Sequence, residues 1–308
     1  MALWPEELEG LREEARQMAG AISDMYSGGA AEPTGSDDRV TSARAMLSSL
    51  EQPSDDGVDE EVGGVPCRVF RPAGASQGTY LHFHGGAMIM GSPRMNDQAN
   101  AALAKRLPVT VVSVDYRLAP EHPFPAGSDD CLAVASAVIE REQGPIVVGG
   151  ESAGGYFAAL VLLRIRDELG AIDRITAANL VYGVFDLSST PSGQGIRPSE
   201  VKDVLGDGDD YVIHAYIPGM TRMDARRPDV SPMWAHLHDM PPALFTVGSA
   251  DHLLDDSLFM SRRWEAYGNE AELAVYPDCI HGFNGFPMEM AKRANERIDT
   301  FLDKAFAG

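Results

Sequence analysis

The sequence predicts an α/β fold in which a mostly parallel β-sheet carries helices on both faces. From about residue 65 onward, short apolar segments alternate with helical segments. Near-continuous apolar strands separated by helices are typical of parallel strands that are buried on both faces. The 308 residues can form one large α/β domain or two average ones, and the 44% hydrophobic content is that of an ordinary globular protein.

The predicted elements follow one another in a regular order. Residues 1–27 form an amphipathic helical stretch, and a second helix is predicted over 40–50 after a stretch rich in Gly, Pro and Ser. A turn-rich acidic segment over 52–59 then leads into the main fold. The predicted strands cover residues 66–70, 79–83, 109–114, 145–148, 178–184, 243–247 and 272–276. The predicted helices that accompany them cover residues 96–106, 128–141, 153–169, 257–266 and 288–306.

Two segments stand outside this alternation. The first 55 or so residues read as an appendage, and the segment from 188 to about 240 is rich in Ser, Pro, Gly, Asp and Arg with little strand character. An insertion of that length in a compact fold is usually functional. We therefore divide the chain into N-terminal cap helices over 1–55, the first part of the core over 56–187, a cap insertion over 188–240 and the second part of the core over 241–308.

Composition excludes several classes of partner. The chain has 25 basic and 46 acidic side chains, a formal net charge of −21, which argues against nucleic acid or an anionic membrane. The three cysteines are too few and too scattered for a disulfide framework or a zinc site, and they suit a reducing, cytoplasmic environment. The first residues lack the pattern of a signal peptide, and no apolar run approaches the length of a membrane span.

The most informative stretch runs over residues 145–155 and reads as strand, sharp turn and helix. Within it, Gly150-Glu151-Ser152-Ala153-Gly154 matches the pattern G-x-S-x-G. A strand-to-helix turn holds a nucleophile in a strained conformation, and the positive end of the following helix favours an anion there. Ser152 is therefore the predicted nucleophile. The alternative is a glycine-rich turn in which Ser152 only caps the helix.

The predicted strand over 79–83 runs into His84-Gly85-Gly86-Ala87. Acyl transfer develops negative charge on a carbonyl oxygen, and loss of one preoriented N–H donor typically costs about 10²–10³-fold in rate. We expect the N–H groups of Gly85, Gly86 and Ala153 to form this oxyanion hole, the alternative being an ordinary turn. His82 and His84 alternate along the strand and would face opposite ways, and no metal-binding motif is present, so no metal is expected.

The acid and the base follow the last two predicted strands. Asp251 stands at the carboxyl end of one strand, and His281 lies on a glycine-flanked loop after the next. We predict that His281 removes the proton of Ser152 and that Asp251 orients the imidazole. Asp255 and Asp256 compete for the acid role, but their place in the first turn of the next helix favours capping. Among the other histidines, His252 beside Asp251 deserves most notice; the remainder are His122, His214, His236 and His238.

With these motifs in place, the sequence resembles the hormone-sensitive lipase family of esterases within the α/β-hydrolase superfamily. The resemblance runs from about residue 65 to the last residue and rests on five motifs. These motifs are Tyr80-Leu-His-Phe-His-Gly-Gly86, Asp115-Tyr-Arg-Leu-Ala-Pro-Glu-His-Pro-Phe-Pro-Ala126, Gly150-Glu-Ser-Ala-Gly-Gly155, Asp251-x-Leu-x-Asp255 and His281-Gly-Phe283. It implies an α/β-hydrolase fold with a two-part cap, a serine carboxylesterase that needs no cofactor, and a preference for short acyl chains.

The sequence departs from the family pattern at two positions. Ala87 replaces the usual third glycine, and because the first two glycines are expected to carry the donors, the hole should survive. The methyl group of Ala87 and the following Met88 are expected to shape the acyl side of the pocket. Glu151 stands where the family often has Asp, and the sequence predicts no consequence of this exchange. Arg117 and Glu121 are expected to tie loops together.

Aromatic residues and methionines of the cap insertion could line the entrance to the site, with packing of the cap as the alternative for each. They are Tyr211, Tyr216, Met220 and Trp234, of which Tyr216 is the predicted substrate contact. An acidic cluster in the same insertion predicts that anionic esters are poorer substrates than neutral ones. Its members are Glu200, Asp203, Asp207, Asp209 and Asp210.

Three functions remain open from the sequence. The first is a serine carboxylesterase acting on small, short-acyl esters, and the second is the same triad acting on an amide, a lactone or a carbamate. The third is a non-catalytic receptor, since the gibberellin receptors resemble this family without its catalytic histidine; the presence of His281 argues against it. Dehalogenases and epoxide hydrolases are disfavoured because they place Asp where Ser152 stands. The expected partner is a small ester, and a homodimer stays open.

Overall fold

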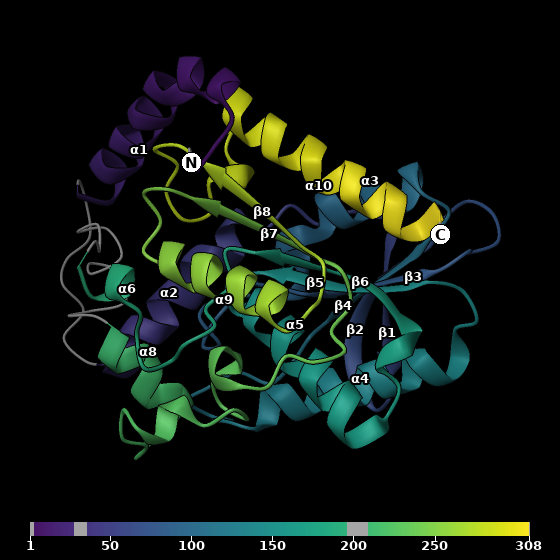
Figure 1. Ribbon diagram of the computed structural model, residues 1–308. Coiled ribbons are helices and arrows are strands. Elements are labelled where there is room, and N and C mark those ends of the chain that lie inside the picture. The colour runs from purple at the N-terminus through teal and green to yellow at the C-terminus, as the bar shows by residue number, and fades with distance from the viewer. Residues whose placement is uncertain (1–2, 28–35, 196–208, 308) are drawn as a thin grey trace.

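The computed structural model describes residues 3–27, 36–195 and 209–307. A sheet of eight strands in the order β1-β2-β4-β3-β5-β6-β7-β8 forms the centre of this part of the chain (Figure 1). Strands β1 and β2 are antiparallel to their neighbours, and the others are parallel. The strands are β1 Gly57–Val62, β2 Val65–Phe70, β3 Thr79–Phe83, β4 Thr110–Val114, β5 Ile146–Glu151, β6 Ile175–Val181, β7 Ala243–Gly248 and β8 Ala271–Tyr276.

Helices cover both faces of the sheet, as the apolar strands require (Figure 1). Helices α3 and α10 lie on one face, and α4, α5 and α9 lie on the other. The longer helices are α1 Arg12–Ser27, α2 Ser36–Leu50, α3 Asp97–Arg106, α4 Ala126–Arg141, α5 Ala153–Arg164, α8 Asp209–Tyr216, α9 Leu254–Ala266 and α10 Glu289–Ala307. Short helical turns include η1 Glu6–Leu11, η2 Pro93–Asn96 and α6 Pro191–Gly195. No helix of the described ranges is long and apolar enough to span a membrane.

The predicted parallel sheet is confirmed, with three local differences in where elements begin or end. The turn-rich segment over 52–59 ends earlier than expected, because β1 begins at Gly57. This edge strand carries exposed acidic side chains, so it lacks the apolar pattern by which the other strands are recognised. Strand β6 begins at Ile175 rather than at 178, and α5 ends at Arg164 before a short π-helical turn.

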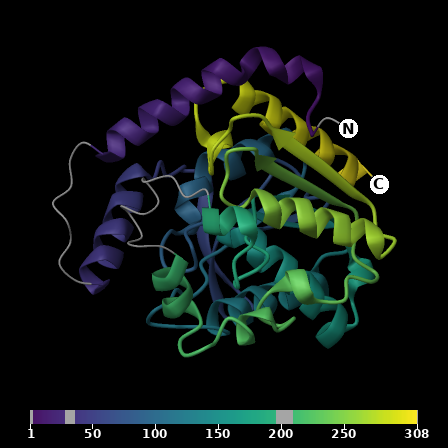
Figure 2. The same cartoon turned by 60° about the vertical axis from the view of Figure 1, so that its left-hand side comes forward.

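The first two helices pack on the outside of this core. Leu8 of η1 and Ala15 of α1 are buried beside α10, and Figure 2 shows α1 crossing over the beginning of α10. Arg12 adds an ion pair with Asp278, at 2.7 Å between Nε and Oδ2. Helix α2 instead buries Val40 in the main cluster on the opposite side. The two segments therefore dock on different parts of the core.

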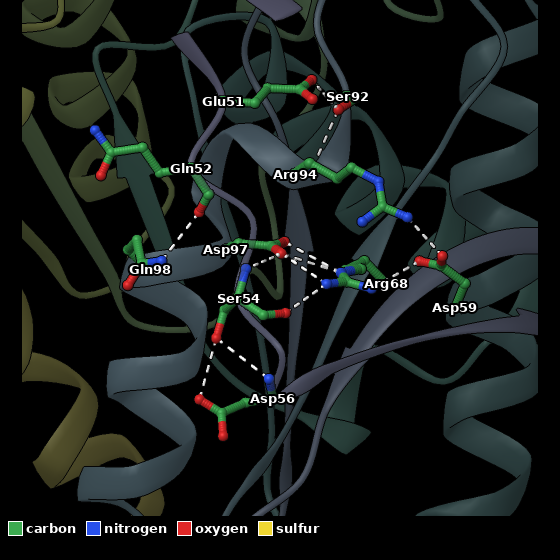
Figure 3. A network of polar contacts seen from close by, with 10 residues as sticks. All are labelled: Glu51, Gln52, Ser54, Asp56, Asp59, Arg68, Ser92, Arg94, Asp97 and Gln98. Carbon is green, nitrogen blue, oxygen red and sulfur yellow. Dashed lines mark hydrogen bonds and ion pairs between the residues drawn. The ribbon is translucent and has the colours of Figure 1, made fainter.

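A buried ion pair fixes the chain between α2 and β1 (Figure 3). The guanidinium of Arg68 donates from Nε and Nη2 to Oδ2 of Asp97, at 3.1 and 2.9 Å. It also donates to the carbonyl oxygen of Ser54 at 2.6 Å and to Asp59 at 3.1 Å. The backbone of Gly57 lies against the guanidinium, where a Cβ would come within 2.5 Å of Nε. One arginine of β2 thus holds both the preceding segment and the first turn of α3.

We expect the exchange Asp97→Ala to lower the free energy of unfolding by about 3–5 kcal/mol, because it leaves the guanidinium of Arg68 buried without its main partner. Chemical denaturation measures this loss. Glu60→Ala is the matched control: it breaks the exposed pair with Arg71 and should cost no more than about 1 kcal/mol. Equal losses in the two variants would contradict the special role of the buried pair.

Candidate active site

The predicted nucleophile lies at a sharp turn between β5 and α5. Ser152 has a φ of 56° and a ψ of −118°, a conformation that residues other than glycine rarely adopt. The carbonyl oxygen of Phe83, at the end of β3, lies very close to this turn. A Cβ on Gly150 would be 2.3 Å from this oxygen, and a Cβ on Gly154 would be 1.9 Å from it. The glycines two residues before and after Ser152 therefore have a steric cause.

A continuous chain of hydrogen bonds joins the three residues predicted as nucleophile, base and acid. His281 Nε2 lies 2.9 Å from Ser152 Oγ, and His281 Nδ1 lies 2.9 Å from Oδ2 and 3.1 Å from Oδ1 of Asp251. These residues follow β5, β8 and β7, respectively. The carboxyl ends of parallel strands meet at one edge of a sheet, and this topology brings together side chains that are far apart in the sequence.

The surroundings of Asp251 keep its carboxylate ionised. Burial opposes ionisation, but the facing imidazole of His281 and its hydrogen bond hold the pKa of Asp251 below its usual value. His252 and the backbone N–H of Leu253, which donates to Oδ1 at 2.8 Å, lower this pKa further. His252 Nδ1 lies 3.5 Å from the same oxygen, and its ring centroid is 4.8 Å from that of His281.

Gly85 is not a free oxyanion donor, and this part of the sequence prediction is wrong. Its N–H donates to Oε1 of Glu151 at 2.8 Å. Because a backbone amide has one proton to donate, Gly85 cannot serve a substrate oxygen at the same time. The N–H groups of Gly86, Ala87 and Ala153 have no acceptor among the residues that the structure describes.

The loop after β3 is tightly wound. Gly86, Ala87 and Met88 have φ values of 123°, 53° and 60°, so three successive residues lie in the left-handed half of the backbone map. The N–H groups of Ile89 and Met90 both donate to the carbonyl oxygen of Gly86, at 3.1 and 3.0 Å. A Cβ on Gly86 would lie 2.0 Å from the carbonyl oxygen of Met90, which excludes any other residue there. Backbone strain of this kind clusters at functional sites.

A second polar network, which sequence reasoning missed, lies behind the nucleophile. Oε2 of Glu151 lies 3.0 Å from Nε2 of His82, and Nδ1 of His82 lies 2.8 Å from Oγ of Ser113. Burial opposes ionisation of Glu151, but the imidazole of His82 and the N–H of Gly85 hold the pKa of this carboxyl below its usual value. The pairing of β3 with β5 in the sheet brings these side chains together.

His84 contacts a different set of partners, as the alternation along the strand predicts. Its ring stacks on Tyr116 with centroids 4.2 Å apart, and the hydroxyl of Tyr116 donates to the carbonyl oxygen of His84 at 2.6 Å. Complete burial lowers the pKa of His84 to about 4, so the ring is neutral near pH 7. His84 therefore supports the loop without adding charge to the site.

Two arginine pairs tie the loop after β4 to helices rather than to other loops, unlike the expectation for Arg117 and Glu121. Arg117 forms a bidentate pair with Asp130: Nη2 donates to Oδ1 at 2.7 Å, and Nε donates to Oδ2 at 2.8 Å. Arg44 of α2 binds both oxygens of Glu121 at 2.7 and 2.8 Å. Nε of Arg44 also donates to the carbonyl oxygen of Ile89 at 2.8 Å. The second N-terminal helix thereby contacts the loop that follows β3.

The structure does not favour Tyr216 as a substrate contact. Its side chain is buried, packs edge-on against Tyr156 and Phe157, and places its hydroxyl 3.4 Å from that of Tyr156. A ring enclosed by other aromatic rings contributes to packing, which was the alternative interpretation. Met88 is also buried, directly after the strained loop, and its role at the acyl side stays a prediction.

The remaining cap predictions divide into two groups. Trp234 is exposed and lies under the guanidinium of Arg226 at 4.8 Å, and Met220 is half-buried. Glu200, Asp203 and Asp207 of the acidic cluster lie outside the described residues. For Asp209, Asp210 and Tyr211 the backbone of α8 is described but the side chains are not.

Asp255 and Asp256 hold the start of the insertion rather than competing for His281. Asp256 is fully buried and accepts the N–H of Phe185 at 2.6 Å and the hydroxyl of Thr190 at 2.7 Å. Burial raises the pKa of Asp256 to about 7. Asp255 accepts the N–H of Ser192 at 2.8 Å. Both carboxylates therefore bind the chain that follows β6, instead of the expected capping of their own helix.

The mostly parallel sheet, the strained serine after β5, and the histidine and aspartate after the last two strands define an α/β-hydrolase. A sequence family described as alpha/beta hydrolase fold matches residues 80–285. The chain is 30% identical to carboxylesterase NlhH of Mycobacterium tuberculosis, over 82% of this chain and 84% of that protein. It is 28% identical to an acetyl-hydrolase of Streptomyces hygroscopicus, over 85% and 87% of the two chains.

Solved structures extend the comparison to nearly the whole chain. The crystal structure of a hormone-sensitive lipase from a metagenome library superposes with a TM-score of 0.80 at 28% identity, covering 95% of this chain and 98% of that one. EstE5, in a crystal soaked with p-nitrophenyl butyrate, gives 0.81 at 26% identity, with 95% and 99% covered. The chain belongs to the hormone-sensitive lipase family of α/β-hydrolases. It is a carboxylic ester hydrolase.

Proposed function

We propose that the protein hydrolyses small, short-acyl esters through Ser152, His281 and Asp251, by way of an acyl-enzyme. The observation that carries this proposal is the unbroken hydrogen-bond chain from Ser152 Oγ through His281 to the buried carboxylate of Asp251. A serine hydroxyl is a weak nucleophile by itself and becomes effective when an oriented base accepts its proton.

In acylation, Nε2 of His281 takes the proton of Ser152 while Oγ attacks the ester carbonyl. The tetrahedral intermediate then collapses, and the same Nε2 gives the proton to the departing alcohol. In deacylation, His281 removes a proton from water, the hydroxide attacks the acyl-enzyme, and the proton returns to Ser152. Asp251 stays ionised throughout, since its role is to hold the Nδ1 proton of the imidazole and to stabilise the imidazolium.

We assign the oxyanion hole to the N–H groups of Gly86, Ala87 and Ala153. Within the described part of the chain these donors have no acceptor, which supports the assignment, because an oxyanion hole needs donors that nothing else uses. The Ala153 N–H belongs to the first turn of α5, where amides have no partner within the helix. Glu151 is then a positioning residue: by binding the N–H of Gly85, it holds the loop from its first residue.

The partner of Glu151 matters for the charge of the site. A bare carboxylate beside an oxyanion hole would oppose the negative charge that develops there. Nε2 of His82 lies 3.0 Å from this carboxylate, which also accepts the N–H of Gly85, so both of its oxygens are hydrogen-bonded. These hydrogen bonds hold the carboxylate away from the reacting carbonyl while it supports the loop.

We also propose that the N-terminal helices and the insertion over 188–240 form one cap. Arg44 of α2, which contacts the loop after β3, and Val40, which is buried in the main cluster with Val212 and Tyr216 of α8, support a common role. Helices α2 and α8 thus lie on the same apolar cluster although more than a hundred residues separate them in the sequence, whereas α1 packs beside α10.

A series of p-nitrophenyl esters tests the substrate class. We expect kcat/KM to be highest for acetate or butyrate and to fall roughly tenfold or more for octanoate and laurate, because Met88, which we propose to bound the acyl side of the site, would reject extra methylene groups. The names of the acetyl-hydrolase and acetyl esterase relatives support the short acyl group. Equal rates along the series would contradict the preference. Faster turnover of matched amides, lactones or carbamates would favour the second candidate instead.

A further inference from the structure

We propose that Asp251, His252 and His281 form an inhibitory Zn²⁺ site in which the catalytic base itself becomes a ligand. One ligand atom from each residue lies within 4.8 Å of the other two. Oδ1 of Asp251 is 3.1 Å from Nδ1 of His281 and 3.5 Å from Nδ1 of His252. Ligands of tetrahedral Zn²⁺ are separated by about 3.4 Å, so these atoms need only small shifts to share one ion.

The donor set selects the class of metal. Two imidazole nitrogens and one carboxylate oxygen suit Zn²⁺ and related transition metals, whereas Mg²⁺ and Ca²⁺ prefer sites built from oxygen. The side chains of His252 and His281 are 13% and 27% exposed, so a cation can approach from solvent and keep a water as its fourth ligand. The net charge of −21 adds a general attraction for cations.

Metal binding would switch off the base by changing its tautomer. In the resting site, Nδ1 of His281 carries a proton toward Asp251, and Nε2 offers its lone pair to the hydroxyl of Ser152. A metal on Nδ1 requires the Nδ1 lone pair, so the proton of the neutral ring moves to Nε2 through solvent. The number of protons on the ring is unchanged. Nε2 is then a donor, and it cannot accept the proton of Ser152.

Other potential zinc ligands within the described part of the chain are less suitable. Burial raises the pKa of Cys67 and of Cys279 to about 12, which disfavours the thiolates that would bind zinc. His238 and Asp239 form an exposed pair at 2.8 Å, with two ligands instead of three. This pair is a matched control, because it offers the same two donor types without the third ligand.

The test uses the full chain with p-nitrophenyl acetate and ZnCl₂, with MgCl₂ as the control for ionic effects. We expect reversible inhibition by Zn²⁺ that a chelator relieves, and no inhibition by Mg²⁺ at the same concentration. His252→Gln should raise the half-inhibiting Zn²⁺ concentration roughly tenfold or more, and His238→Gln should leave it unchanged. Equal sensitivity of all three proteins, or no inhibition by Zn²⁺, would overturn the proposal.

The inhibition rests on the proposed function, so a second measurement reads metal binding alone. Titration calorimetry of the Ser152→Ala variant with ZnCl₂ should show binding of one ion per chain, and the added exchange His252→Gln should weaken it by the same factor. Absence of this binding overturns the metal site whatever the activity shows. If the wild-type chain hydrolyses no ester even with chelator present, the proposed function fails while calorimetry still decides on the metal.

Discussion

Exchange of Ser152 for alanine is expected to lower kcat/KM for p-nitrophenyl acetate by about 10⁴-fold or more. The hydroxyl at this position is the atom that would form the acyl-enzyme, and no other group stands 2.9 Å from Nε2 of His281 among the described contacts. The remaining oxyanion donors could still assist attack by water, so a small residual rate above the uncatalysed reaction is compatible with the assignment.

The measurement combines steady-state kinetics with active-site labelling. An organophosphonate should add covalently to the wild-type chain at the peptide that contains Ser152 and leave Ser152→Ala unmodified. Ser49→Ala, which changes an exposed serine of α2, is the control for nonspecific effects and should keep both activity and labelling. Undiminished hydrolysis by Ser152→Ala would refute the triad, and absence of labelling in the wild-type chain would favour a receptor.

Exchange of Glu151 is expected to produce the second largest effect. Glu151→Ala removes the acceptor of the Gly85 N–H and the partner of His82, so the loop that carries Gly86 and Ala87 loses its support. We expect kcat to fall by about 10²-fold with little change in KM, because oxyanion donors act on the transition state more than on the bound ester. The rate should be expressed per active site, counted by phosphonate labelling, to separate it from loss of folded protein.

The conservative variant separates geometry from charge. In Glu151→Gln, the amide oxygen can still accept the N–H of Gly85, and the amide nitrogen can donate to a neutral His82 whose other nitrogen donates to Ser113. Most of kcat should therefore return if the role of Glu151 is to position the loop. Loss of activity in Glu151→Gln as large as in Glu151→Ala would point to the charge instead. Full activity of both variants would refute the positioning role.

The pH dependence of stability follows from the same carboxylate. The folded state holds the pKa of Glu151 below its usual range, so the stabilisation is present above the ordinary pKa of a glutamate. It is lost as the pH falls through the lowered value.

Local sequence patterns were sufficient to select three side chains at strand ends that the structure brings together. Ser152, Asp251 and His281 each follow a strand on a turn with a recognisable composition, and the structure brings them within hydrogen-bond distance. The glycines two residues before and after Ser152 record the close packing of α5 on the neighbouring strand. The alternation of side chains along a strand likewise predicted that His82 and His84 face opposite ways, and the two rings contact different partners.

The tertiary structure decided what depends on contacts between distant segments. No pattern within the loop after β3 indicates that the N–H of Gly85 is already used; that depends on Glu151, which is 66 residues further along the chain. Contacts between distant segments also decide that Tyr216 packs among other aromatic rings. They decide as well that residues 57–62 form the edge strand β1, although the exposed acidic side chains of this segment are typical of a loop. A sequence records which group can donate or accept, but whether a donor is free depends on which acceptor the fold places beside it.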